Sequence, residues 1–280
     1  MKRSTTVAVV ALLAGPALLA PSAAAAAVPA AATSCADVTD GSTVEGDLVV
    51  RAGSTCELAD VVVTGQTRLG EAAELSLTGA TLGGRVAVGP DAALDLDGST
   101  VEGRLVHRGY SVTATGSTFA GAVVVAADVA RPALLVVEGG EVAGEVRAVG
   151  AEVVLEGTRV GGDVVTESGS ATDVVDTVVR GDLQVLGSTA GALVCESEVH
   201  GDALFGDNDL GVQLGRTGPL AECDGQGVWG GDVVVEGTDG EVRLDGNIVR
   251  GDLSGVDNAP APTGADNRVR GELRGQMADL

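Results

Sequence analysis

Seven acidic residues recur at one place in a repeating pattern of this sequence, and they are the first candidates for chemistry. Each directly follows a glycine, so a regular structure would stack their carboxylates in a column. Ca²⁺ accepts several oxygen ligands, and the candidates for such a site are Asp182, Asp202, Asp207 and Asp209. We favour solvated corner residues that accept backbone N–H groups, because like charges about 4.8 Å apart repel by only about 0.9 kcal/mol in water. The seven members of this acid column are Glu145, Asp163, Asp182, Asp202, Asp232, Asp252 and Glu272.

Two members of the acid column belong to Arg-Gly-Asp tripeptides, at residues 180–182 and 250–252. Arg-Gly-Asp is the tripeptide by which many matrix proteins engage integrins. Both copies occupy the same slot of the repeat, where other copies read HGD, GGD, EGD and RGE. Short motifs have a high false-positive rate, so we interpret the tripeptides as part of the repeat.

A long irregular segment, residues 203–228, is the second candidate site. It carries Arg216 and acidic residues, and Phe205 and Trp229 lie at or beside its ends. Irregular protrusions from repeat proteins often carry binding sites. The sequence therefore predicts that any ligand loop includes Phe205, Arg216 and Trp229, although a plain surface loop fits the same residues.

Catalytic constellations are not recognisable in the sequence. Polysaccharide processing uses aromatic platforms and paired carboxylates, but the chain has one Trp, one Tyr and two Phe. His107 and His200 stand isolated. The formal net charge of −23 disfavours nucleic acid and anionic lipid as partners. We expect no enzyme activity, no nucleic-acid partner and no cofactor, with Ca²⁺ the one ion considered.

The repeat behind these motifs predicts the fold. Its unit is an apolar residue, a variable residue, glycine, a polar or acidic residue, and then alternating Val or Leu. Alternation indicates strands, and so short a unit buries its apolar face only by stacking on its neighbours. We expect an all-β, right-handed parallel β-helix of about twelve coils with roughly 19–20 residues per coil. The repeat glycines are Gly46, Gly65, Gly84, Gly103, Gly121, Gly144, Gly162, Gly181, Gly201, Gly231, Gly251 and Gly271.

The four cysteines fit this stacking. Cys35 and Cys56 are about one coil apart, and Cys195 and Cys223 span the long coil. Residues one period apart lie near the Cα separation that a disulfide prefers. The sequence predicts the pairs Cys35–Cys56 and Cys195–Cys223, as expected of an exported protein.

The N-terminus has the features of a signal peptide. Lys2 and Arg3 precede an apolar run, and A-x-A cleavage choices follow. We predict a signal peptide at 1–27, with cleavage as late as 32, and a secreted protein without membrane contact after cleavage. We divide the rest of the chain into an N-terminal cap at 28–42, the β-helix at 43–254, and a last coil with its cap at 255–280. Both ends look covered, so we expect a monomer.

Several stretches carry a family resemblance. The VxGDVxV pattern, the GATLGG segment and the closing DNAPAPTGADNRVRGELRGQ resemble secreted β-helix proteins of high-GC Gram-positive bacteria, a group without an established activity. The resemblance covers nearly all of the mature chain and implies its fold and export. Relatives carry cysteines near the positions of Val256 and Met277, so a third disulfide is not available here. A weaker similarity is to bactofilins, which polymerise end to end but lack signal peptides and disulfides.

The functional expectation follows from these points. We expect a secreted, non-catalytic structural or binding protein of the extracellular space or cell envelope, with a cell-wall or extracellular glycan as partner. One alternative is a β-helix that binds or degrades polysaccharide. The second is a bactofilin-like head-to-tail polymer.

Overall fold

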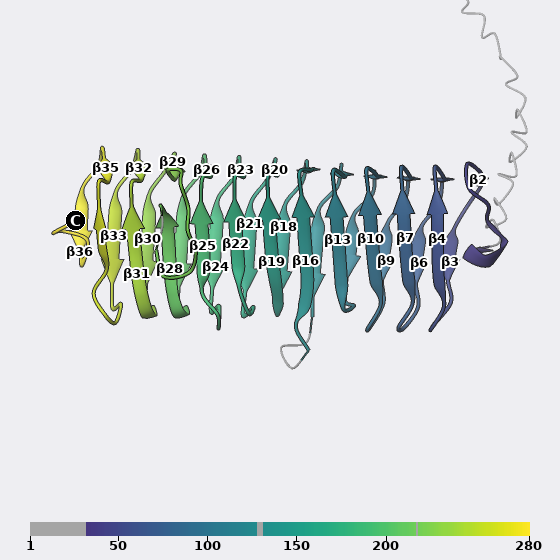
Figure 1. The fold of residues 1–280 in the computed structure, drawn as a ribbon, viewed down its shortest axis with the longest axis horizontal. Helices are drawn as coiled ribbons and strands as arrows, with labels where there is room; N and C mark the ends of the chain where they lie inside the picture. Colours follow the sequence, from purple (N-terminus) through teal and green to yellow (C-terminus); the bar gives the residue numbers. More distant parts are fainter. Residues whose placement is uncertain (1–31, 128–130, 217) are drawn as a thin grey trace, which may run out of the picture.

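The chain forms a β-solenoid in which three parallel sheets run the length of a rod (Figure 1). The computed structural model describes residues 32–127, 131–216 and 218–280. The predicted signal peptide lies outside these residues. The all-β parallel solenoid is confirmed, with about 19 residues per coil. Its right-handed winding stays a prediction from the crossover preference.

Each coil visits the three sheets in a fixed order, from a two-residue strand of sheet B through the repeat glycine to sheet A, and then by a turn to sheet C. Along the axis, sheet A contains β1 (Thr33–Ser34), β3 (Leu48–Val50), β6 (Thr67–Leu69), β9 (Val86–Val88), β12 (Leu105–His107), β15 (Val123–Ala126), β18 (Val146–Val149), β21 (Val164–Glu167), β24 (Leu183–Leu186), β27 (Ala203–Gly206), β30 (Val233–Glu236), β33 (Leu253–Val256) and β36 (Leu273–Gly275). Sheet B contains β2 (Thr43–Val44), β5 (Val62–Val63), β8 (Thr81–Leu82), β11 (Thr100–Val101), β14 (Thr118–Phe119), β17 (Glu141–Val142), β20 (Arg159–Val160), β23 (Val178–Val179), β26 (Glu198–Val199), β29 (Val228–Trp229), β32 (Ile248–Val249) and β35 (Arg268–Val269). Sheet C contains β4 (Thr55–Ala59), β7 (Glu74–Thr78), β10 (Ala93–Asp97), β13 (Ser111–Thr115), β16 (Ala133–Glu138), β19 (Ala151–Glu156), β22 (Thr172–Val175), β25 (Ala192–Cys195), β28 (Asp209–Gly215), β31 (Asp239–Asp245) and β34 (Thr263–Ala265).

The predicted coil number needs a small correction. Sheet B has twelve strands in the described residues, one before each repeat glycine, but sheet A has thirteen. The extra strand is β1, which lies in the predicted N-terminal cap and pairs Thr33 with Leu48 and Ser34 with Val49. No glycine of the repeat marks it, so the period missed it. A short 3-10 helix, η1 (Cys35–Asp37), follows directly.

Alternation along each strand builds one continuous core. In β12, Leu105 and His107 are buried while Val106 between them is partly exposed. Sheet A stacks such positions in register, as in Val88, His107 and Val125. Every coil therefore completes the hydrophobic column of its neighbours.

Side chains at the corners satisfy backbone N–H groups that the strands leave unpaired. Where sheet C meets sheet B, Ser117 Oγ accepts the N–H of Ser99 at 3.0 Å, and Asn267 Oδ1 accepts that of Asn247 at 3.0 Å. At the corner between sheets A and C, Asn208 Oδ1 accepts the N–H of Ser188 at 2.9 Å. Each bond joins one coil to the next, so the corners align the coils as the strands do.

Chain covers the N-terminal end of the rod, whereas the last coil, formed by β34 to β36, is covered only in part. The predicted disulfide Cys35–Cys56 is present, with a Cα–Cα distance of 6.3 Å, and it ties η1 to the first strand of sheet C. At the other end Met277 is fully buried against the core. Two disulfides are compatible with an extracellular location. None of the helices in the described ranges has the length and apolar character of a membrane span.

One titratable side chain lies inside the core. His107 is fully buried, and its Nδ1 accepts the N–H of Gly109 at 3.2 Å. Burial lowers the pKa of His107 from 6.5 to about 4, only partly offset by the backbone of Leu134. The neutral imidazole is thus the form that the fold accepts.

We predict that this histidine makes the protein acid-sensitive. Between pH 6.5 and about 4 the unfolded chain binds a proton that the folded chain rejects, so the free energy of unfolding falls as the pH falls through this window. The shift corresponds to about 3 kcal/mol. Between pH 7 and pH 4, the free energy of unfolding measured with urea should fall by about 3 kcal/mol less in His107→Leu than in the unmodified protein.

Val125→Ala is the matched control, because Val125 stacks directly on His107. It should lower stability about equally at both pH values. Identical pH dependence for His107→Leu and the unmodified protein would contradict the assignment.

Candidate functional site

The acid column is a hydrogen-bonded part of the corner between sheets B and A. Oδ1 of Asp182 accepts the backbone N–H of Asp202 at 2.9 Å, and Oδ1 of Asp202 accepts that of Asp232 at 2.8 Å. The interpretation as corner residues that accept N–H groups is therefore confirmed for the aspartates of the acid column. The same bond joins Asp47 to Gln66, Asp163 to Asp182, Asp232 to Asp252 and Asp252 to Glu272.

The repeat glycine makes room for this bond. A Cβ on Gly201 would overlap Oδ1 of Asp182 and lie 2.7 Å from the carbonyl oxygen of Gly181. Gly201 also donates its own N–H to that carbonyl, at 3.1 Å. Glycine and the acid of the preceding coil thus form one structural unit, and the glycine is needed for close approach.

The Arg-Gly-Asp tripeptides lie within these corners. Residues 180–182 connect β23 to β24, and residues 250–252 connect β32 to β33. The ion pairs to corner aspartates come from other arginines. Arg68 pairs with Asp47 at 2.7 Å, and Arg274 pairs with Asp252 of the acid column at 2.8 Å. The repeat, with no projecting loop, accounts for both tripeptides.

The four calcium candidates do not form one cluster. Asp182 and Asp202 precede strands β24 and β27, whereas Asp207 and Asp209 follow β27 at the opposite end of that strand. Across residues 32–127, 131–216 and 218–280, no three His, Cys, Asp or Glu side chains come together as metal ligands would. The geometry gives the Asp carboxylates a structural role through their Oδ1 atoms.

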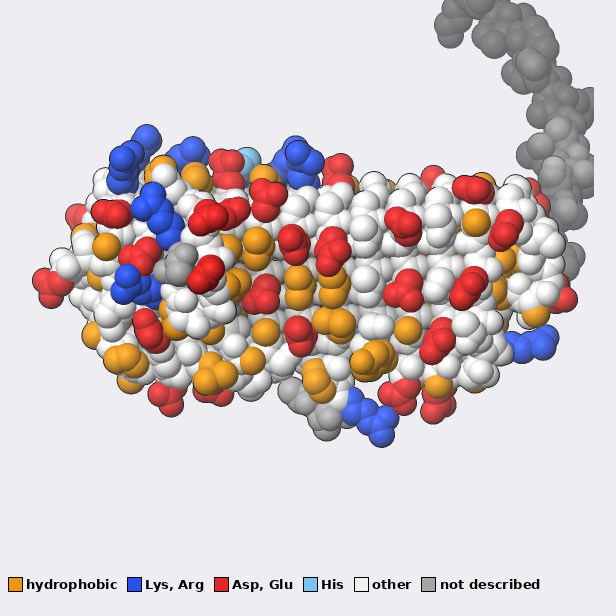
Figure 2. Space-filling view, viewed as in Figure 1, with side chains coloured by type: hydrophobic (Ala, Val, Ile, Leu, Met, Phe, Trp, Pro, Cys, Tyr) orange, Lys and Arg blue, Asp and Glu red, His pale blue; other side chains and the backbone are white. Residues whose placement is uncertain are grey.

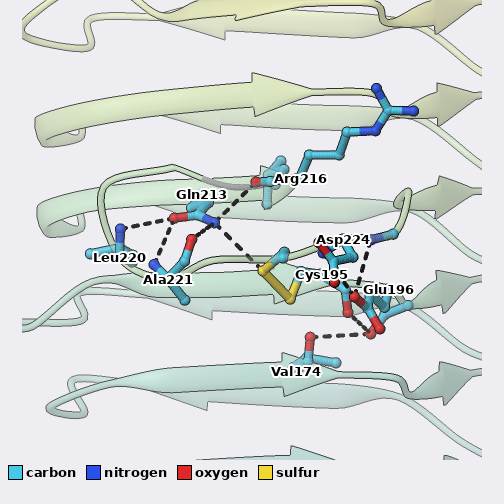
Figure 3. Close-up of a disulfide and its surroundings, with 12 residues drawn as sticks. Val174, Cys195, Glu196, Gln213, Arg216, Leu220, Ala221 and Asp224 are labelled. Carbon is cyan, nitrogen blue, oxygen red and sulfur yellow. Dashed lines mark hydrogen bonds between the residues drawn. A yellow bond between two sulfur atoms is a disulfide. The ribbon is translucent and has the colours of Figure 1, made fainter.

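The long coil contains an inserted loop, residues 216 and 218–227, that folds over the outer face of sheet C (Figure 3). Gln213, in β28, lies beneath the loop and binds it through its side-chain amide. Its Nε2 donates to the carbonyl oxygens of Arg216 and Ala221 at 3.0 and 2.9 Å, and its Oε1 accepts the N–H of Leu220 at 2.8 Å. Gln213 is fully buried with its amide satisfied, so the loop has a defined position.

Two further contacts fasten the loop to the coil before it. The predicted disulfide Cys195–Cys223 is present, with a Cα–Cα distance of 6.1 Å. Oε1 of Glu196 accepts the N–H groups of Asp224 and Gly225, both at 3.0 Å. Leu193 is buried with the disulfide in a small apolar cluster, so the loop shields an outward-facing part of sheet C.

The prediction that Phe205 and Trp229 line a ligand loop is wrong. Phe205 is 0% and Trp229 1% exposed, and their rings meet edge to face with centroids 6.1 Å apart. Both occupy inward positions of the repeat, in register with Val185 and Val199. The indole N–H of Trp229 donates to Asn247 Oδ1 at 3.0 Å. These rings are core residues, so neither is a surface for ligand.

Arg216, the third predicted residue, does line a surface hollow beside the loop. Its guanidinium lies over Gly246, where an added Cβ would be 2.7 Å from Nε, and its Nη1 is 3.6 Å from Asp266 Oδ2. This long-coil hollow has a volume of about 290 Å³. It is lined by Arg216, Gln226, Gly246, Ile248, Asp266, Asn267 and Arg268.

The surrounding surface is unusual for this chain. Arginine side chains gather towards the C-terminal end of the face in Figure 2, whereas acidic side chains are spread along it. Farther along sheet C, burial raises the pKa of Asp173, and Glu152 adds to the shift. Asp173 stacks between Val154 and Leu193, which explains the loss of solvent around its carboxyl group.

Comparisons with known proteins add no assignment. No protein-family model, no curated protein and no solved structure matches this chain. The interpretation of the site therefore depends on its geometry.

Sequence reasoning missed the residues that build the hollow. Gln213 and Glu196 fasten the loop, and Asn267 and Arg268 come from the second coil after it. The burial of outward-facing polar positions beneath an insertion has no signal in the period. The repeat does indicate where Asn267 and Arg268 lie, because both belong to the corner between β34 and β35 and this corner recurs in every coil.

We predict that the acid column stabilises the rod without metal. Asp202→Ala removes the acceptor for the N–H of Asp232 and should lower the free energy of unfolding by about 1 kcal/mol. Asp202→Asn keeps an oxygen at Oδ1 and should cost less. Urea unfolding with and without a calcium chelator measures both variants.

The calcium hypothesis makes the opposite forecast for these samples. It requires that the chelator destabilise the unmodified protein and that Asp202→Asn match Asp202→Ala.

Proposed function

We propose that this chain is an exported, non-catalytic binding protein of the cell envelope or extracellular space, and that its partner is a glycan. The observation that carries the proposal is the long-coil hollow, whose wall is a loop fastened by Gln213, Glu196 and a disulfide. Loop positions fixed in this way lose little conformational entropy on binding. A rigid rod presents the hollow at a constant place on its surface.

The polar groups of the hollow suit sugar hydroxyls. Gln226 offers an amide, Arg216 and Arg268 offer planar guanidinium donors, and Ile248 supplies an apolar wall. A volume of about 290 Å³ is at the lower end for small-molecule pockets. One or two sugar rings would fill it.

Binding explains the hollow better than hydrolysis does. Glycoside hydrolysis uses two carboxyl groups on either side of the scissile bond. Among the described residues lining the hollow, Asp266 is the acid, and Arg216 pairs with it. A polysaccharide-degrading β-helix is therefore the less favoured alternative.

Export and oligomeric state belong to the same proposal. The signal-peptide pattern, the acidic composition and the two disulfides support secretion.

A monomer is supported by the cover at each end, although Val269 and Leu273 of the last coil are only partly buried. Light scattering across a range of concentrations separates a monomer from the head-to-tail polymer.

We predict that a glycan array of neutral and acidic cell-wall oligosaccharides will detect binding by the disulfide-intact mature protein. The double variant Arg216→Ala, Arg268→Ala should weaken the strongest interaction at least tenfold, because it removes both guanidinium groups from the hollow. Arg159→Ala, Arg180→Ala is the control with the same charge change, since both arginines are exposed elsewhere on the rod.

Two results would contradict the proposal. One is the absence of binding to every glycan, and the other is equal binding by the hollow variant and the unmodified protein.

A further inference from the structure

A second hollow lies at the corner between sheets A and C, away from the inserted loop. It has a volume of about 420 Å³, and its lining comes from three successive turns: Pro90 and Asp91, Arg108 to Tyr110, and Arg131 and Pro132. The spacing from Gly121 to Gly144, which contains the third turn, is enlarged. We call this the Tyr110 hollow.

Tyr110 presents the only solvent-exposed aromatic ring of the described residues. Its side chain is 68% exposed, whereas Phe119, Phe205 and Trp229 are buried in the core. Tyr combines a flat apolar ring with a polar hydroxyl group, which is why it is enriched at binding interfaces.

The backbone beneath the ring is held firmly. The N–H of Tyr110 donates to Ala92 O at 2.8 Å, and the carbonyl of Tyr110 accepts the N–H of Leu134 at 2.9 Å. The preceding N–H, of Gly109, donates to the buried His107 at 3.2 Å. The ring therefore stands on a turn whose position is set by both neighbouring coils, and binding there need not order the chain.

The charge around the ring differs from that of the whole protein. Arg108 and Arg131 line the hollow against one acid, Asp91, in a chain of net charge −23. Arg131 Nη1 is 3.2 Å from Asp91 Oδ2, and both side chains are largely exposed. An exposed ion pair of this kind contributes only about 0–1 kcal/mol, so Asp91 leaves Arg131 available to support a carboxylate that binds Arg108.

We infer that the Tyr110 hollow binds a short acidic oligosaccharide through one carboxylate-bearing sugar. The apolar C–H face of the sugar ring packs on Tyr110. The carboxylate of the sugar accepts two parallel hydrogen bonds from the guanidinium of Arg108, and Arg131 lies at the rim of the hollow. The ligand is short, because a long polyanion would extend over the acidic surface on either side. This site is separate from the long-coil hollow and does not depend on it.

The test uses trigalacturonate as the probe and isothermal titration calorimetry on the disulfide-intact mature protein. Tyr110→Ala and Arg108→Gln should each weaken binding at least tenfold. The methyl-esterified trisaccharide, which keeps the shape without the charge, should also bind at least tenfold more weakly. Arg104→Gln is the matched control, since Arg104 is exposed on the same coil but does not line the hollow.

The outcomes separate the two sites. No binding of trigalacturonate at millimolar concentration overturns this inference, as does binding that survives both Tyr110→Ala and Arg108→Gln. Binding lost only in Arg216→Ala, Arg268→Ala also overturns it while leaving the long-coil hollow in place. Melting temperatures close to that of the unmodified protein confirm that each variant is folded.

Discussion

The C-terminal half of the rod depends on the bond between a corner carboxylate and the backbone N–H of the next coil. Asp182 and Asp202 show it clearly, each reaching with Oδ1 to the following member of the acid column. It is possible only because the adjoining residue, such as Gly201, has no side chain to occupy the same space. Glycine followed by aspartate therefore recurs for a steric and a hydrogen-bonding reason together. At the other two corners, serine, threonine and asparagine side chains form the equivalent hydrogen bond. A side-chain oxygen of each accepts a backbone N–H of the preceding coil. Such bonds at the three corners hold the coils in register, while the interior is packed mainly by apolar side chains.

A rod made in this way has little on its regular faces for a ligand to grasp, and the two enlarged coils supply what the repeat does not. The inserted loop, residues 216 and 218–227, covers Leu193 and the disulfide, and its Arg216 lines the same hollow as Arg268 of a later coil. In the other enlarged coil, Arg131 lines the Tyr110 hollow together with Arg108. In both places arginine, which acidic residues outnumber in this chain, is found in pairs. Both places are also braced by hydrogen bonds to the coils beneath, so each combines local positive charge with rigidity.

The parts of this structure that were predictable from sequence are those that the period determines locally. Stacking at one coil per repeat placed the strands, the sheets and both cysteine pairs correctly, since each needs only the residues one period away. β1 was missed because it lacks the glycine that marks every other coil. Phe205 and Trp229 were assigned to a ligand loop because aromatic residues are rare here, although the alternation already placed both inward. The long-coil hollow was only partly predictable. Arg216 was found, but the contacts of Gln213 and Glu196 depend on how an insertion folds back, and no periodic pattern records that.

The central claim is that the recurring acids maintain the rod and that binding belongs to the enlarged coils. Amide hydrogen exchange, measured residue by residue with and without trigalacturonate, tests it most directly. The account predicts that the N–H groups of Asp182, Asp202 and Asp232 are protected in the free protein and unchanged by the sugar, because carboxylates already accept the bonds from these groups. It also predicts that exchange slows on addition of the sugar around residues 108–110 and 131–134. Rapid exchange along the acid column in the free protein, or protection that appears there only with the sugar, would contradict the account.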